Sequence, residues 1–176
     1  GILKLMNRRC DSAMLDRLVE ETKRRGIAVR TTFMVGFPTE TERQFETLCG
    51  FVGRSNLENV GIFAYSTEED TPSAKLKPRV PKSVKAKRVN ALGKLQLDNV
   101  RKRNASMIGK VEQVLYEDID YDKNMFVGRT QQNAPDIDSV VYFTADFVDV
   151  GSVYKVKITG YEDYDLIGEV IGEYSN

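Results

Sequence analysis

The chain has 176 residues, of which 41% are hydrophobic and 30% charged, the composition of a globular protein with one large or two small domains. Its net charge is zero, and it has two cysteines and no histidine, which excludes a disulfide framework, a Cys/His metal cluster and a histidine base. No apolar run approaches the roughly 20 residues that span a bilayer, and we expect no signal peptide. We therefore expect a reduced, cytoplasmic protein without a membrane partner, and from the abrupt start at Gly1 we expect a fragment of a longer protein.

The first 65 residues alternate between helical and extended patterns. Residues 11–25 predict a helix that ends at Gly26. Residues 27–37 predict an apolar strand, and the apolar positions of residues 45–52 recur at helical spacing. A second strand, VGIFAY, covers residues 60–65. Two strands with a helix between them form a βαβ unit, whose strands pair in parallel.

A proline-containing loop and a long helix follow. The loop covers residues 66–81, and the helix is expected over residues 81–107. Apolar residues recur on one face of this helix, and its other face is strongly basic. Solvation is the plainer interpretation of the basic face.

From residue 109 the hydrophobic pattern changes to alternation, which is typical of half-buried strands. Turn residues separate five such segments, which predict a small closed barrel of the OB type. The predicted fold is therefore α/β followed by all-β, with domains at residues 1–108 and 109–176. The five predicted strands cover residues 109–117, 125–130, 139–143, 153–161 and 165–170.

The sequence GFPTETE, at residues 36–42, joins the first strand to the next helix. Gly36 allows close approach of the backbone, Pro38 stiffens the turn, and Thr39 or Thr41 can open a capping box. The plainer interpretation is a well-formed strand-to-helix turn. The functional interpretation rests on its position, because α/β barrels bind ligands at the carboxyl ends of their strands. Backbone and apolar side chains can hold a cofactor there without a catalytic side chain.

The stretch FMVGFPTETERQFETL, followed by VGIFAYSTEEDTPSAKL, resembles the second half of a radical-SAM methylthiotransferase. The patterns of that family are close to VGFPGET and YSxExGTPAA. The lead-in ILKLMNRR and the terminal barrel, which is similar to a TRAM domain, extend the resemblance to nearly the whole chain. The resemblance implies the C-terminal portion of a partial TIM barrel of the radical-SAM type, followed by a five-stranded, OB-like TRAM barrel.

The family uses S-adenosylmethionine and two 4Fe–4S clusters, which cysteines in earlier parts of its members ligate. The CxxxCxxC motif is absent here, and Cys10 and Cys49 do not replace it. The resemblance therefore implies no metal ligand and no catalytic residue in this chain, and we expect the chain alone to be inactive. In the family reaction, a methylthio group replaces the hydrogen of an unactivated C–H bond.

The resemblance also implies residues that approach the cofactor. Arg30 is a polar residue in a mostly apolar strand, and it can pair with the carboxylate of S-adenosylmethionine if it faces the barrel. A surface salt bridge is the alternative for Arg30, and core packing is the alternative for Phe63. The other predicted cofactor residues lie at the two strand ends: Val35, Gly36, Phe37, Ala64 and Tyr65.

Three turn positions depart from the family pattern. The usual Gly after GFP is Thr39 here, the usual Pro after YS is Thr67, and the usual Gly before TP is Asp70. These departures affect the shapes of the loops more than the overall assignment.

The family has two branches. One modifies an adenosine of tRNA, and the RimO type modifies an aspartate of a small-subunit ribosomal protein; TRAM is the recognition barrel in both. Residues 109–176 carry 5 Lys and Arg against 14 Asp and Glu, a net charge of −9, whereas residues 1–108 have a net charge of +9. An RNA-binding barrel is expected to be basic, so the charge favours a basic small-subunit ribosomal protein as partner, with tRNA less favoured. The segment QQNAPDIDSVVYF also resembles the RimO type.

The acidic residues that we predict to bind this partner gather in three turns. An acidic surface that serves only solubility is the plainer alternative. Two other functions stay open, namely a tRNA-modifying enzyme and a non-catalytic OB-like binding module. The predicted partner-binding residues are Glu117, Asp118 and Asp120 in the first turn, Asp136 and Asp138 in the second, and Glu162, Asp163 and Asp165 in the third.

Overall fold

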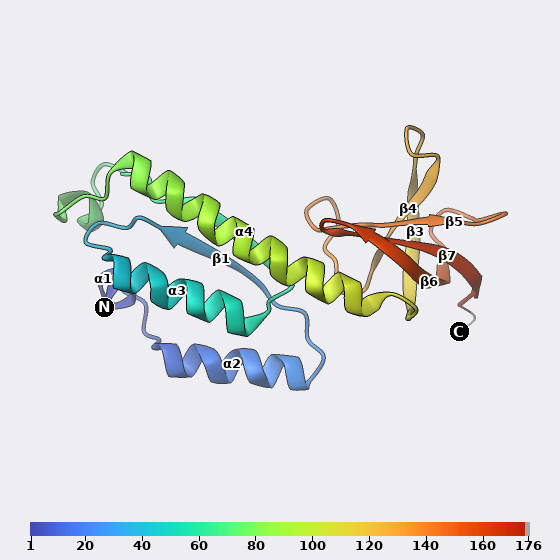
Figure 1. The fold of residues 1–176 in the computed structure, drawn as a ribbon, viewed down its shortest axis with the longest axis horizontal. Coiled ribbons are helices and arrows are strands. Elements are labelled where there is room, and N and C mark those ends of the chain that lie inside the picture. The colour runs from blue at the N-terminus through green and yellow to red at the C-terminus, as the bar shows by residue number, and fades with distance from the viewer. Residues whose placement is uncertain (175–176) are drawn as a thin grey trace. The chain divides into compact units, whose positions relative to one another are not determined.

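The computed structural model describes residues 1–174 and consists of two compact units, which divide between Asn99 and Val100 (Figure 1). This division lies within the long helix α4, whose last turns belong to the second unit. The domain boundary predicted after residue 108 stays a prediction. No helix within residues 1–174 is long and apolar enough to cross a membrane.

The first unit contains a parallel pair of strands with helices before, between and after them. Strand β1 pairs with β2 in the register that sets Arg30 opposite Asn59 and Val35 opposite Ala64. The predicted parallel pair is thus present. The elements are α1 (Ile2–Leu5), α2 (Ser12–Arg24), β1 (Arg30–Val35), α3 (Glu42–Ser55), β2 (Asn59–Ala64), the 3₁₀ helix η1 (Pro72–Lys75) and α4 (Lys82–Met107).

The helix that follows the GFPTETE turn begins with a capping box. Thr41 Oγ1 accepts a hydrogen bond from Gln44 N at 3.3 Å, and Gln44 Oε1 accepts one from Thr41 N at 2.9 Å. Of the two predicted boxes, the one at Thr41 is therefore present. Thr39 lies in the turn with φ +72°, which excludes it from a helix start of this kind.

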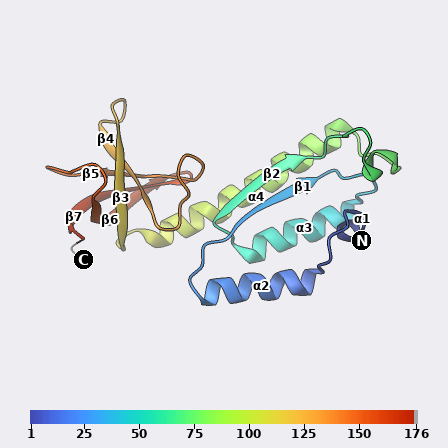
Figure 2. The ribbon, with the colours of Figure 1, turned by 180° about the vertical axis from the view of Figure 1, so that it is seen from behind.

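The core of the first unit covers one face of the strand pair. Phe33, Val35 and Ile62 lie on this face and pack with apolar residues of α3 and α4. Because side chains alternate across a strand, Met34 and its pairing partner Phe63 lie on the opposite face. Phe63 is 44% exposed there. Figure 2 shows this open face toward the viewer, with α4 behind it.

Helix α4 buries polar side chains as well as apolar ones. Gln96 Nε2 donates a hydrogen bond to Leu57 O at 3.0 Å, and Asn99 Nδ2 donates one to Val52 O at 3.0 Å. Arg88 is also buried. Arg88 lies one helical turn from Leu92, within the apolar arc of the helix, and ion pairs hold it inside the unit. Lys87 and Lys94 on the predicted basic face are exposed.

The second unit contains a closed five-stranded barrel, as predicted. Its strand order is β3-β4-β5-β7-β6, in which β5 and β7 are parallel and every other pair is antiparallel. The prediction of an OB-like barrel is confirmed. The strands are β3 (Val111–Asp120), β4 (Met125–Thr130), β5 (Val141–Thr144), β6 (Val153–Glu162) and β7 (Asp165–Glu173).

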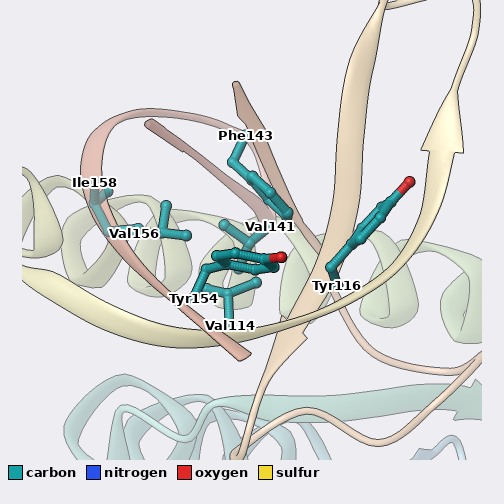
Figure 3. Close-up of a cluster of buried hydrophobic side chains, with 7 residues drawn as sticks. All are labelled: Val114, Tyr116, Val141, Phe143, Tyr154, Val156 and Ile158. Carbon is teal, nitrogen blue, oxygen red and sulfur yellow. The ribbon is translucent and has the colours of Figure 1, made fainter. Parts of the chain in front are cut away.

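Alternation along the strands fills the interior of the barrel. On β6, Tyr154, Val156 and Ile158 are buried, whereas Lys155 and Lys157 are exposed. The interior cluster is shown in Figure 3 and consists of Val114, Tyr116, Val141, Phe143, Tyr154, Val156 and Ile158.

Candidate functional site

The carboxyl ends of β1 and β2 bring most of the predicted cofactor residues together. Tyr65 N donates a hydrogen bond to Val35 O at 2.8 Å, so the two chain segments leave the sheet side by side. The rings of Phe37 and Tyr65 meet edge to face with their centroids 5.3 Å apart. Gly36 and Ala64 adjoin these residues in the chain. This geometry is consistent with the prediction that residues at the ends of both strands contribute to one cofactor site.

Arg30 lies at the other end of β1, where it is exposed. Five residues separate it from Val35, and at a rise of roughly 3.3 Å per residue the two Cα atoms are about 16 Å apart. Arg30 is on the same face of the strand as Thr32 and Met34, which is the open face. It therefore does not join the residues of the GFPTETE turn.

The side chains at the strand ends differ in what they can offer a ligand. Val35, Phe37 and Tyr65 are buried within the first unit, so their side chains are already in contact with protein. Phe63 and Ala64 are exposed. A ligand at this edge would therefore meet the side chains of Phe63 and Ala64 rather than those of the three buried residues.

The absence of a side chain at Gly36 is explained by a lysine of this same chain. A Cβ at Gly36 would overlap the side chain of Lys85, a residue of α4. Lys85 Nζ donates a hydrogen bond to Tyr65 O at 2.7 Å and lies 5.0 Å from the centroid of the Tyr65 ring. Gly36 has φ +72°, a conformation that also favours glycine. The sequence prediction that the Gly36 backbone approaches a cofactor stays a prediction, and it did not include Lys85.

A buried ion pair between Glu40 and Arg88 stabilises the turn at Gly36. The Glu40 carboxylate accepts hydrogen bonds from Gly36 N and from Arg88 Nη1, the latter at 2.7 Å. The two side chains are only 5–6% exposed. Arg88 Nη2 also donates to Glu42 Oε2 at 2.9 Å, and the guanidinium lies over the Phe45 ring. The turn is thus held by a charge network between residues 36 and 88.

The electrostatics of this network keep Arg88 charged. Burial opposes the charge, but hydrogen bonds and attraction from Glu42 and Glu40 outweigh it and raise the pKa of Arg88. Sequence reasoning missed this pair. A signal was present, because Arg88 and Gln96 lie one helical turn to either side of the core residue Leu92.

Thr39 offers a direct test of strain in the turn. It is β-branched and has φ +72°, a region that costs a non-glycine residue about 1–2 kcal/mol. Since glycine also gives the unfolded chain about 0.4–1 kcal/mol of extra freedom, we expect Thr39→Gly to raise the free energy of unfolding by about 0.5–1 kcal/mol. Urea denaturation measures this. The comparison variant is Asp70→Gly at φ +65°, for which a smaller gain is expected because Asp tolerates this region; a loss of stability in Thr39→Gly would contradict the assignment.

The two cysteines bear on whether this chain could hold an iron–sulfur cluster. Within residues 1–174, no group of three or more Cys, His, Asp or Glu side chains is arranged to hold a metal ion. Both Cys10 and Cys49 have free thiols. Burial, followed by the charge of Glu42, raises the pKa of the Cys49 thiol, so that it is protonated at neutral pH. These residues do not fit an iron–sulfur cluster.

Several of the predicted partner-binding carboxylates of the barrel form ion pairs within the second unit. Arg129 Nε donates to Glu117 Oε1 at 2.7 Å, and Lys123 Nζ donates to Glu162 Oε2 at 2.7 Å. Asp163 accepts from Arg101 Nε at 3.0 Å. These pairs lower the net charge that the three acidic turns present to a partner.

Other predicted carboxylates stabilise turns by accepting hydrogen bonds from backbone N–H groups. Asp120 accepts from Lys123 N at 2.9 Å, Asp138 from Ala134 N at 2.7 Å and Asp165 from Val140 N at 2.9 Å. Asp118 accepts from the adjacent Ile119 N at 2.8 Å. Asp136 is exposed in a turn, with φ +60°. Much of the acidic character therefore has a structural use, which net charge alone does not reveal.

The comparisons with known proteins agree with the fold and with the resemblance. Residues 108–171 match the TRAM domain family. The chain is 45% identical over 99% of its length to "Ribosomal protein uS12 methylthiotransferase RimO" of Acetivibrio thermocellus. It is 41% identical over 98% of its length to the protein of the same name from Syntrophotalea carbinolica, and 42% identical over 97% to that of Geobacter sulfurreducens.

The chain spans 38–39% of the length of these relatives. Its similarity extends across both compact units, since the alignments leave at most 3% of the chain unmatched. Together with the barrel, these alignments confirm the resemblance to the RimO-type methylthiotransferases over nearly the whole chain and show that the chain carries a TRAM domain.

Proposed function

We propose that this chain is part of an enzyme that methylthiolates an aspartate side chain of the ribosomal protein uS12, with S-adenosylmethionine and two 4Fe–4S clusters as cofactors. The observation that carries the proposal is the 45% identity to a uS12 methylthiotransferase over 99% of the chain. The clusters would be ligated outside this chain, which alone would be inactive.

The open face of the β1–β2 pair supports a place in the wall of a partial TIM barrel. Helices α3 and α4 cover one face of the pair, as helices cover the outside of an α/β barrel. The other face carries Met34 and the exposed Phe63, and it would line the interior. By this proposal Phe63 and Ala64 contact S-adenosylmethionine, Gly36 contributes backbone, and Arg30 faces the same interior from the far end of β1.

The charge of the barrel unit supports a protein substrate. Residues 109–176 have a net charge of −9, and phosphate contacts supply most of the affinity in RNA binding. A basic ribosomal protein is electrostatically complementary to such a surface, whereas tRNA is repelled.

Mass spectrometry of the product tests the proposal. The full-length protein, reconstituted anaerobically with iron and sulfide, is incubated with S-adenosylmethionine, a reductant and uS12, and in parallel with tRNA. We expect the mass of one methylthio group on a single aspartate of uS12. Modification of an adenosine in tRNA with unmodified uS12 would instead identify the sibling activity. Failure to modify either substrate would favour a binding module.

A second experiment concerns the predicted cofactor surface. In the reconstituted full-length protein, Phe63→Ala is expected to weaken binding of S-adenosylmethionine by about tenfold or more, because an apolar contact surface is lost. The matched control is Phe51→Ala in α3, which removes a half-buried aromatic residue of the same unit that packs on Phe33. Equilibrium dialysis with labelled cofactor measures both. Equal affinities for Phe63→Ala and the wild type would remove Phe63 from the proposed site.

A further inference from the structure

The loop between β5 and β6, residues 145–152, has a fixed backbone. Val148 packs against the interior cluster of the barrel. Asp149 N donates a hydrogen bond to the hydroxyl of the buried Tyr154 at 2.8 Å (Tyr154 is labelled in Figure 3). Gly151 N donates to Tyr116 O at 2.9 Å, and Tyr116 N donates to Ser152 O at the same distance. The loop is therefore held by the core on both sides of residue 150.

This fixed loop nevertheless exposes two large apolar side chains. Phe147 is 75% exposed and Val150 is 70% exposed. Isolated exposed apolar residues are common on protein surfaces. Here two of them lie within four residues, and Val148 between them packs inside. They form an apolar surface that the loop already holds in place before any partner binds. Such a surface loses little conformational entropy on binding.

Strand pairing places more apolar residues at the same end of the barrel. Because β5 and β7 are parallel and Thr144 is opposite Glu169, the chain beyond Thr144 and the chain beyond Glu169 leave the sheet in one direction. Ile171 in this part of β7 and Tyr174, which directly follows the strand, are exposed. Tyr174 N donates a hydrogen bond to Val153 O at 3.0 Å, where the loop ends. We call Phe147, Val150, Ile171 and Tyr174 the barrel-end patch.

The charge around the barrel-end patch is negative. Residues 144–152 and 169–174 contain four carboxylates and no Lys or Arg. Lys155, opposite Gly172 on β6, is a neighbouring cation. Within residues 1–174, Asp146 and Asp149 form no ion pair, in contrast to Glu117 and Glu162 in the predicted acidic turns. Their charges are therefore available to a partner.

We propose that the barrel-end patch is the docking surface for a basic segment of the protein substrate. Phe147 and Val150 would bind its apolar side chains, and Asp146 and Asp149 would pair with its Lys or Arg residues. RNA fits poorly, because aromatic stacking platforms for bases are set in basic surfaces. The identity of the partner as uS12 rests on the proposed function, whereas the position of the docking surface rests on the loop.

The test measures binding of the whole chain to uS12 with two sets of variants. The double variant Phe147→Ser/Val150→Ser removes the apolar anchors, and we expect it to bind about tenfold more weakly or worse. The double variant Asp146→Asn/Asp149→Asn is expected to weaken binding at low salt and to flatten its salt dependence. Because all four side chains are exposed, the thermal midpoint and far-UV spectrum should match the wild type, which separates lost binding from lost folding.

Ile137→Ser is the matched control. Ile137 is 72% exposed and lies between Asp136 and Asp138, but in the loop at the opposite end of the barrel, beside the turn that precedes Leu166. We expect this variant to bind as the wild type does. Equal weakening by Ile137→Ser, unchanged binding by the Phe147→Ser/Val150→Ser variant, or loss of tRNA binding rather than uS12 binding would each overturn the proposal. If the wild-type chain does not bind uS12 at all, the docking proposal is also overturned, whereas the activity of the full-length protein on uS12 still decides the proposed function separately.

Discussion

Replacing Arg88 with methionine is expected to lower the free energy of unfolding of the first unit by about 3–5 kcal/mol, because it leaves the Glu40 carboxylate buried without its partner. The pair is 2.7 Å apart and both side chains are buried. Methionine keeps much of the volume and the contact with the Phe45 ring, so the loss of charge pairing dominates the effect. Urea denaturation followed by far-UV circular dichroism measures the change.

Two further variants separate the charge effect from packing. In Glu40→Gln/Arg88→Met, the glutamine carbonyl can still accept the hydrogen bond from Gly36 N, and no buried charge remains. We expect this double variant to recover much of the stability that Arg88→Met loses. The exposed Arg43→Met on α3 is the control, with an expected change within about 0.5 kcal/mol. If Arg88→Met and Arg43→Met unfold at the same urea concentration, the buried pair does not hold the turn.

Gly128→Ala is expected to lower the free energy of unfolding of the barrel by about 3 kcal/mol, the upper part of the range for overpacking. A Cβ at Gly128 would overlap Leu115 O of the adjacent strand and would crowd Val114 Cγ1 at 2.7 Å. The obstacle is backbone rather than the end of a flexible side chain, so β3 and β4 must move apart. The register of β3 and β4 shifts between Tyr116 and Asp118, next to this contact. The two strands therefore have little room to move apart there.

Gly172→Ala is the matched control for this prediction. Gly172 also lies in a barrel strand, β7, but no atom lies within 4 Å of an added Cβ. We expect a change within about 0.5 kcal/mol, since only the freedom of the unfolded chain differs. Thermal unfolding monitored by tyrosine absorbance reports on both variants. Equal stabilities of the two alanine variants would show that β3 and β4 are not packed as closely as the structure places them.

The barrel was predictable because its physical cause is local. Alternation of Tyr154, Val156 and Ile158 with Lys155 and Lys157 follows directly from one buried and one exposed face. Turn residues between the strands gave the limits of the strands to within a few residues. The closure of the barrel followed from the number of short strands.

The turn at Gly36 was less predictable because its contacts are distant in the sequence. Glu40 and Arg88 are 48 residues apart, so no local pattern indicates that they pair, although helical periodicity places Arg88 beside the core residue Leu92. Only the fold brings them together, and only the fold shows that Lys85 fills the space beside Gly36. For the same reason Arg30 shares a strand with the turn but lies at its other end.

Net charge correctly described the barrel unit as acidic, but it did not identify which carboxylates are available. Asp120 and Asp138 accept hydrogen bonds from the backbone of their own turns, a use that depends on local geometry. Asp146 and Asp149 were not singled out by sequence, since an exposed Phe147 cannot be told from a core phenylalanine before the fold is known.

We propose that the acidic TRAM unit recognises a basic ribosomal protein rather than RNA. The most direct measurement is the affinity of the whole chain for uS12 and for a tRNA anticodon stem-loop, each by fluorescence anisotropy across a salt titration. We expect saturable binding to uS12 that weakens as salt increases, and no saturable binding to the stem-loop. Saturable, salt-sensitive binding to the stem-loop without binding to uS12 would contradict the proposal and would mean that basic groups of the chain, including those of residues 1–108, outweigh the charge of −9 on residues 109–176.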